Sequence, residues 1–206
     1  MSDFKIVLTN VAKEFNRRIV LDDISLSLKV GESIAITGKN GTGKSTLSKI
    51  VAGVLTPSRG KVEYFADGKK LDADRVKDAI GFVSPYLNVY DEFSALENLI
   101  ILSRIRSGKS ALDARMEELL KLVNLWSRRD DRVGVYSSGM KQRLKYAFAL
   151  LHHPRLLILD EPTSNLDSDG VEVVKTIAQE QRKTGILVVA TNDKTESAWC
   201  RKRLRL

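Results

Sequence analysis

The chain has 206 residues, of which 43% are hydrophobic and 29% are charged, and this composition excludes a disordered protein. Its length suits one domain with a sizeable core. The 34 basic and 26 acidic residues leave a net charge of +8, which favours anionic partners without choosing among nucleotide phosphates, nucleic acid and an acidic membrane surface.

A single cysteine, Cys200, excludes an internal disulfide and fits a reducing compartment. The first ten residues include Asp3 and lack the basic and then apolar layout of a signal peptide. No apolar stretch approaches the ~20 residues that cross a bilayer. We therefore expect the chain to act on a membrane, if at all, through a partner.

The first half of the chain favours strands around one helix. Ile6, Leu8 and Val11 roughly alternate with polar residues, as do the apolar residues between 19 and 28. A buried strand is expected at Ser33–Thr37, followed by a Gly-rich turn and a helix from about Lys44 to Leu55. Residues 61–65 look like a strand that enters a turn.

In the second half, a stretch from roughly Pro85 to Lys145 is mostly helical in pattern. Strand-like runs return at Leu156–Leu159 and Ile186–Ala190, with a helix between them. Buried strands separated by helices predict an α/β fold with a parallel sheet. We expect one domain over residues 1–206, with a small antiparallel β subdomain near the N-terminus and an inserted helical subdomain over about 85–145.

The spacing of residues 38–46 matches a phosphate-binding P-loop. Its glycines let backbone N–H groups point at phosphate oxygens, and the following helix adds its positive end. Lys44 can reach the β- and γ-phosphates, and the Ser45 hydroxyl can bind Mg²⁺. The alternative is a Gly-rich turn with a chance lysine. The residues expected to hold nucleotide are Gly38, Lys39, Asn40, Gly41, Thr42, Gly43, Lys44, Ser45 and Thr46.

Two carboxylates, Asp160 and Glu161, end the hydrophobic run that begins at Leu156. Adjacent strand residues point to opposite faces, so the two acids are expected to differ in role. Asp160 would hold Mg²⁺, and Glu161 would polarise the water that attacks the γ-phosphate. Alternatively, the pair caps a following helix that has Pro162 in its first turn.

Residues 136–143, Tyr-Ser-Ser-Gly-Met-Lys-Gln-Arg, resemble the signature motif of ATP-binding cassette (ABC) ATPases, and Ser164–Asp167 resembles the D-loop of that family. The resemblance spans about residues 4–192 in the order of the family. It implies a P-loop NTPase core, ATP and Mg²⁺ as ligands, Phe15 stacked on adenine with Val20 close by, and Asp167 at the nucleotide.

The signature residues Ser137, Ser138 and Gly139 precede a helix, so their donors and its dipole suit an anion. In the family this site meets the γ-phosphate held by the opposite subunit, which implies a dimer. Ser138 replaces the first glycine of the motif, and Met140 replaces its final glutamine. A simple helix cap is the alternative interpretation.

Two further positions depart from the family. No glutamine occurs between Gly60 and Arg132, so Ser84 or Pro85 stands where the family has its Q-loop glutamine. Asn192 stands where it has a switch histidine. Asparagine can donate a hydrogen bond to a γ-phosphate but cannot exchange a proton near neutral pH. We therefore expect Glu161 and Asn192 to be the catalytic residues and hydrolysis to be slow.

The resemblance implies the ATPase subunit of a transporter, located in the cytoplasm on the inner face of a membrane. Its partners would be a membrane-spanning subunit and a second ATPase subunit, as a homodimer, with no nucleic acid. The alternatives are a soluble ABC ATPase outside transport and a weakly hydrolysing regulator. The basic tail Arg201–Leu206 is read as a solvated end with an edge strand, or else as a contact for acidic lipid or RNA.

Overall fold

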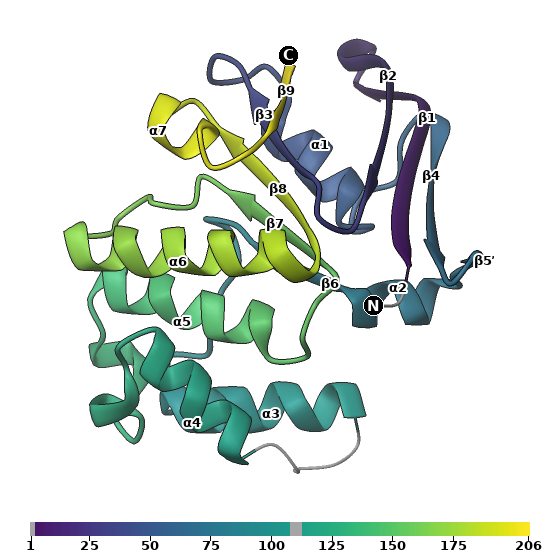
Figure 1. The fold of residues 1–206 in the computed structure, drawn as a ribbon. Helices are drawn as coiled ribbons and strands as arrows, with labels where there is room; N and C mark the ends of the chain where they lie inside the picture. The colour runs from purple at the N-terminus through teal and green to yellow at the C-terminus, as the bar shows by residue number, and fades with distance from the viewer. Residues whose placement is uncertain (1–2, 108–112) are drawn as a thin grey trace.

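The computed structural model describes residues 3–107 and 113–206 and contains two sheets with helices around them (Figure 1). The larger sheet is entirely parallel, and its strands lie in the order β6-β7-β8-β3-β9. These strands are β3 (Ser33–Thr37), β6 (Ile80–Val83), β7 (Leu156–Asp160), β8 (Ile186–Thr191) and β9 (Lys202–Arg205).

The register of the parallel sheet places three strand ends at one edge. Thr37 of β3 is level with Thr191 of β8, and Ala190 is level with Asp160 of β7. The loops that follow these strands therefore begin side by side. In open α/β sheets, ligands bind at the carboxyl ends of the strands.

The smaller sheet is antiparallel, in the order β2-β1-β4-β5, and confirms the β subdomain expected near the N-terminus. Its strands are β1 (Phe4–Phe15), β2 (Arg18–Lys29), β4 (Arg59–Ala66) and β5 (Lys69–Lys70). Gly60 has no room for a side chain, because a Cβ atom there would lie 2.2 Å from the Asn10 carbonyl oxygen. The two sheets confirm the α/β class with a P-loop core.

The helices are α1 (Lys44–Val51), α2 (Ala73–Ala79), α3 (Ala95–Ser107), α4 (Asp113–Leu122), α5 (Ser138–Leu150), α6 (Ser168–Thr184) and α7 (Lys194–Ser197). The expectation that α1 extends to Leu55 was wrong, because the chain turns at Gly53, which has φ +72°. The sequence did not predict α2 or α7. Of the helical stretch expected over about 85–145, residues 108–112 lie outside the described residues, and its boundaries stay a prediction.

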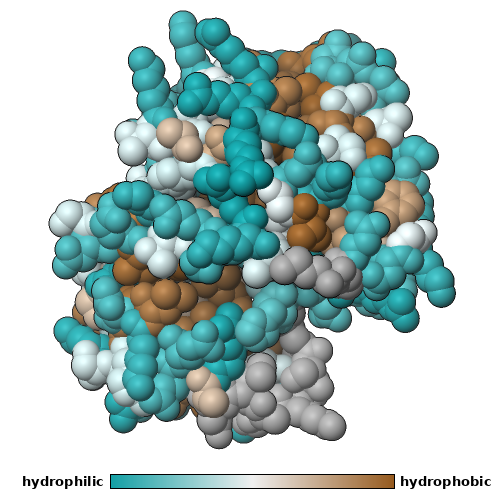
Figure 2. Space-filling view, in the orientation of Figure 1, coloured by the Kyte–Doolittle hydropathy of each residue, from teal (hydrophilic) through white to brown (hydrophobic). Residues whose placement is uncertain are grey.

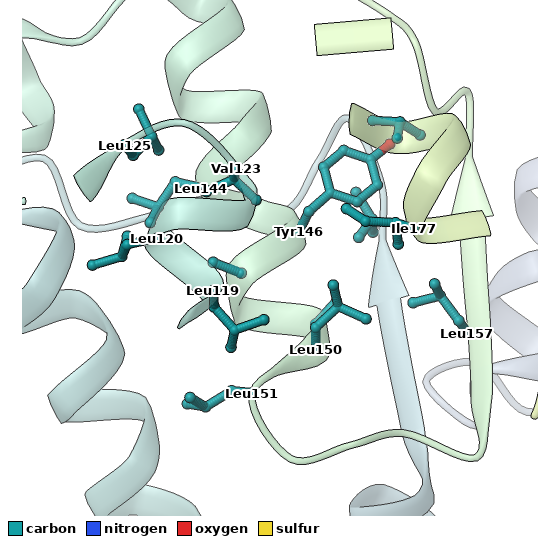
Figure 3. Close-up of a cluster of buried hydrophobic side chains, with 14 of the residues drawn as sticks. Leu119, Leu120, Val123, Leu125, Leu144, Tyr146, Leu150, Leu151, Leu157 and Ile177 are labelled. Carbon is teal, nitrogen blue, oxygen red and sulfur yellow. The ribbon is translucent and has the colours of Figure 1, made fainter. Parts of the chain in front are cut away.

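Strand β7 separates two hydrophobic cores. Leu157 and Leu159 belong to the core beneath α4, α5 and α6, part of which Figure 3 shows. Leu156 and Ile158 belong to the other core, between the parallel sheet and the antiparallel sheet. Because successive strand residues face opposite sides, one strand supports both layers. Tyr64 strengthens the second core by donating a hydrogen bond to the Val51 carbonyl at the end of α1, at 2.9 Å.

Hydrophilic residues cover most of the face in Figure 2, and hydrophobic residues reach the surface in its lower half and at its upper right. A pocket of about 460 Å³ in the helical part is lined by Leu122, Leu150 and Ile177, among others. Within the part of the chain that the structure describes, no helix is both long and apolar enough to cross a membrane.

Candidate nucleotide-binding site

The loop between β3 and α1 is closed around the side chain of Lys44. This lysine is only 5% exposed, and its Nζ donates to the Gly38 carbonyl at 3.0 Å and the Lys39 carbonyl at 3.2 Å. The Thr42 hydroxyl donates to the same Lys39 carbonyl. The ammonium group is therefore held inside the loop, where it can meet an anion.

Gly43, the residue before α1, requires both a left-handed backbone and a close contact. Its φ is +100°, and a Cβ atom there would lie 2.9 Å from the side chains of Val20 and Leu21. The loop therefore packs directly against β2. This contact places the predicted adenine neighbour Val20 beside the phosphate-binding residues.

A pocket of about 330 Å³ lies in front of the loop. It is lined by Val20, Asn40, Gly41, Gly43, Lys44, Ser45, Thr46, Tyr86 and Glu161. The structure thus brings together Val20, the loop and the predicted catalytic acid. Phe15 lies elsewhere on the same hairpin, at the end of β1, with 45% of its surface exposed and Lys13 Nζ 5.0 Å from its ring centre. Its contact with adenine stays a prediction.

Asp160 ends β7 with a fully buried side chain, and neither of its carboxylate oxygens accepts a hydrogen bond of good geometry from a described residue, although the Ser45 hydroxyl lies nearby. Burial raises the pKa of this carboxyl group, while the Ser45 hydroxyl and the charges of Lys49 and Lys44 act in the opposite direction. A buried carboxylate without donors is suited to a cation. Asp160 and Ser45 therefore fit Mg²⁺, which prefers oxygen ligands and binds with few protein groups plus substrate phosphates.

Glu161 has a left-handed backbone conformation, with φ +50°. Its N–H donates to the Ala190 carbonyl of β8 at 2.9 Å, which continues the pairing of β7 with β8. Such a conformation in a residue other than glycine stores strain of about 1–3 kcal/mol and concentrates at functional sites. The turn directs the Glu161 side chain into the phosphate pocket.

Asn192 follows β8, and its Nδ2 donates to Oδ1 of Asn40 at 3.1 Å. It lines a second, larger pocket of about 990 Å³ together with Gly38, Lys39 and Thr42. Asn40 lines both pockets and so forms a wall between them. The two predicted catalytic residues, Glu161 and Asn192, therefore approach the same loop from neighbouring strands.

The signature residues lie at the start of α5. Ser137 caps this helix by accepting a hydrogen bond from Met140 N–H at 3.2 Å. Ser138 lines a different pocket, between α5 and the segment around Pro85. Among the described residues, the wall of the phosphate pocket includes none of the signature, so one chain does not bring the two anion sites together.

The remaining predicted residues of this region have structural roles in the chain. Met140 is partly buried and packs against the helical core. Gly139 lies close to the D-loop, because a Cβ atom there would be 3.0 Å from the Asn165 carbonyl oxygen. Asp167 caps α6 by accepting a hydrogen bond from Gly170 N–H at 2.8 Å. Contacts of these residues with a nucleotide stay predictions.

Sequence reasoning missed Tyr86 and Lys49. Tyr86 follows the Ser84 and Pro85 pair, is 72% exposed and lines the phosphate pocket. Lys49 lies one helical turn after Ser45, with its Nζ 4.9 Å from the centre of the Tyr86 ring. The i, i+4 spacing from Ser45 was the available signal for Lys49, whereas nothing in the sequence paired it with Tyr86.

Proteins of the same family resemble this chain in sequence. The sequence profile of the ABC transporter family matches residues 21–164, and the chain belongs to that family. The Nod factor export ATP-binding protein I of Bradyrhizobium diazoefficiens is 37% identical over 81% of the chain and 55% of its own length. The bacitracin transport ATP-binding protein BcrA of Bacillus licheniformis is 34% identical over 85% of the chain and 58% of its own length. The chain thus spans little more than half the length of these relatives.

Solved structures share the whole fold. A dimeric post-hydrolysis state of an ATP-binding cassette bound to ADP and phosphate superposes with a TM-score of 0.84 at 27% identity, covering 98% of this chain and 94% of the other. The ATP-binding subunit of an ABC transporter gives a TM-score of 0.85 at 26% identity, covering 98% and 85%. These likenesses confirm the P-loop cassette fold and the ABC ATPase class expected from the sequence.

Proposed function

We propose that this chain binds and hydrolyses ATP with Mg²⁺ as the motor subunit of a membrane transporter. The observation that carries the proposal is the single pocket in which Lys44, Ser45 and Glu161 meet, with the unpartnered Asp160 behind them. A phosphate cradle alone would serve binding. The added carboxylate of Glu161 is what hydrolysis requires.

Each residue has a distinct task in this proposal. The loop N–H groups and Lys44 bind the β- and γ-phosphates, and Asn192 offers a donor near the γ-phosphate. Ser45 and Asp160 would hold Mg²⁺, which neutralises phosphate charge when bound. Glu161 polarises the attacking water and accepts a proton from it. The new bond between the water oxygen and the γ-phosphorus forms as the bond from that phosphorus to the bridging oxygen breaks, and ADP leaves.

We further propose that a second copy of the chain completes the site. Ser137, Ser138 and Gly139 form a helix N-terminus that does not line the phosphate pocket of their own chain. In a head-to-tail pair, this helix end would face the γ-phosphate held by the partner. Closure and opening of that pair would be the mechanical output, and similar cassettes are described as dimeric.

The membrane-spanning partner is proposed to grip the cleft between the core and the helices, from the cytoplasmic side. A pocket of about 500 Å³ lies there, with Pro85 and Tyr90 on one side and Lys141 and Ser164 on the other. Support comes from relatives that are named as export and transport ATP-binding proteins.

Glu161→Gln tests the proposal. We expect the variant to keep ATP affinity, to lose turnover and to elute as a dimer with ATP, because glutamine holds the water without activating it. Glu172→Gln, on the exposed face of α6, is the matched control and should behave as wild type. Normal turnover of Glu161→Gln would exclude Glu161 as the base.

Co-purification from detergent-solubilised membranes tests the membrane partner, and failure to recover one would favour a soluble ATPase.

A further inference from the structure

We propose that Glu196 is a positioning residue that fixes the backbone carrying Glu161 and links it to the loop containing Asn192. The inference rests on the proposed ATPase function. It concerns a buried carboxylate on α7 that neither the P-loop nor the acidic strand uses.

Glu196 is 4% exposed, and its Oε1 accepts hydrogen bonds from both the N–H and the hydroxyl of Thr163. The N–H contact measures 3.1 Å. Thr163 lies two residues after Glu161, in the turn that follows β7. A charged acceptor that takes two bonds from one residue holds that residue more firmly than a neutral one.

The helix that carries Glu196 is itself fixed close to Asn192. Asp193 caps α7 by accepting hydrogen bonds from Thr195 N–H at 2.6 Å and Glu196 N–H at 3.0 Å. Its own N–H donates to the Thr191 hydroxyl at the end of β8. A displacement of Asn192 is therefore passed to Glu196 through a short capped turn.

A second anchor reaches the same turn from the opposite side. Tyr146 of α5 is fully buried, and its hydroxyl donates to the Pro162 carbonyl at 2.6 Å. Figure 3 shows its ring beside Ile177, with the hydroxyl directed away from Leu119 and Leu120. The helix that begins at the signature thus contacts the peptide next to Glu161.

Three successive residues are consequently held by three different elements. Glu161 N–H bonds to β8, the Pro162 carbonyl to α5 and Thr163 to α7. Glu161 has a backbone conformation that residues other than glycine rarely adopt, so it depends on such anchors. These three contacts form a clamp, made by β8, Tyr146 and Glu196, that sets the direction of the Glu161 carboxylate. A movement of α5 or α7 would change that direction.

The test separates positioning from packing. In Glu196→Ala we expect kcat to fall about 10- to 100-fold, since small misplacements of a reacting group have effects of this size, with the Kd for ATP within about twofold. Glu196→Gln keeps an acceptor oxygen and should recover most of the lost kcat. Ser197→Ala is the matched control, because this neighbour on α7 is also buried and its side-chain hydroxyl donates only to the Lys194 carbonyl among the contacts described.

Thr163→Val removes the hydroxyl and keeps the N–H, so it should lower kcat less than Glu196→Ala does. The double variant should be no slower than Glu196→Ala, because both changes remove the same contact. Additive losses would show that Glu196 acts elsewhere and would overturn the clamp. A parallel loss of ATP affinity and kcat in both Glu196 variants would also overturn it.

Hydrogen exchange at the Thr163 amide gives a readout without hydrolysis. We expect exchange in the apo protein to be at least tenfold faster in Glu196→Ala than in Ser197→Ala. If the wild type hydrolyses ATP and Glu196→Ala changes neither the exchange rate nor kcat, the clamp is overturned and the ATPase function stands. A wild type that binds no ATP would instead remove the proposed function, and the clamp with it.

Discussion

The side-chain amide of Asn192 donates a hydrogen bond to Oδ1 of Asn40, 3.1 Å away. The two residues follow β8 and β3, whose last residues, Thr191 and Thr37, are level in the sheet. The residue after β8 is thereby held against the phosphate-binding loop. It supplies a donor there but cannot exchange a proton near neutral pH.

We expect Asn192→His to raise kcat about tenfold or more with little change in KM. The wild type, with only the donor, should turn over well below the typical enzyme value of ~10 s⁻¹, because acid–base groups contribute about 10²–10⁴ in rate. An effect on kcat alone is the pattern of an interaction made in the transition state. Steady-state phosphate release measures both constants.

Two other outcomes have clear meanings. An unchanged kcat in Asn192→His would place the limitation at Ser84 or Pro85, where the Q-loop glutamine is absent, and a glutamine at one of these positions would then be needed as a second change. Brisk hydrolysis by the wild type that slows in Asn192→His would show that asparagine is a working catalytic residue. The view of the chain as a weakly hydrolysing regulator would then be wrong.

Lys44→Ala is expected to weaken Mg²⁺-ATP binding about ten- to a hundred-fold. The ammonium group is held in the loop by the Gly38 and Lys39 carbonyls, and a charge-assisted bond contributes roughly 1.5–3 kcal/mol. Isothermal titration calorimetry measures the change. Lys175→Ala, on the exposed face of α6, is the control and should bind normally. Unchanged affinity in Lys44→Ala would remove the phosphate-site assignment.

Asp160→Asn is expected to stabilise the apo protein at neutral pH. Burial raises the pKa of Asp160 in the folded state above its ordinary value of 3.8. At pH values between the unfolded-state pKa and the higher folded-state pKa, the folded state therefore binds more protons than the unfolded state. Wild-type stability therefore falls as pH rises through this window, and the asparagine variant should lack that component. Denaturant unfolding of both proteins from pH 4 to pH 8 measures the difference.

The same variant should lose the Mg²⁺ dependence of ATP binding, because a neutral amide is a poor ligand for a hard cation. Titration of ATP with and without Mg²⁺ checks this. A less stable variant at neutral pH would mean that Asp160 has partners in the apo protein. Unaltered Mg²⁺ dependence would assign the cation to other residues.

Tyr64→Phe should lower the free energy of unfolding by about 1–3 kcal/mol, because the buried Val51 carbonyl would lose its donor. Denaturant unfolding measures the loss. Tyr90→Phe is the control for stability, since Tyr90 is 53% exposed and should lose little. Equal stability of both variants would show that the bond between β4 and α1 contributes nothing net.

The parts of the site that the sequence predicted are those formed by neighbours along the chain. Residues 38–46 form a loop because a strand, a turn and a helix occur in succession there. Asp160 and Glu161 have different surroundings because they are adjacent, so one is buried in the sheet and the other lines the pocket. Local spacing is sufficient for such features.

The contacts that the sequence could not predict join residues distant along the chain. Glu196 bonds to Thr163, 33 residues away, and Tyr146 bonds to Pro162, 16 residues away. Each pairing depends on how the helices pack on the sheet, which periodicity alone does not determine. Even α7, a helix of four residues, was too short to leave a periodic pattern.

Tyr64 joins the antiparallel sheet to α1 and Gly43 packs against β2, so the hairpin of β1 and β2 is tied to the phosphate-binding loop at two points (Figure 1). A movement of the phosphate-binding loop should therefore also move the exposed turn of that hairpin. A fluorophore attached there, paired with another on the outer surface of α4, would report single-molecule distance changes between the two halves of the protein.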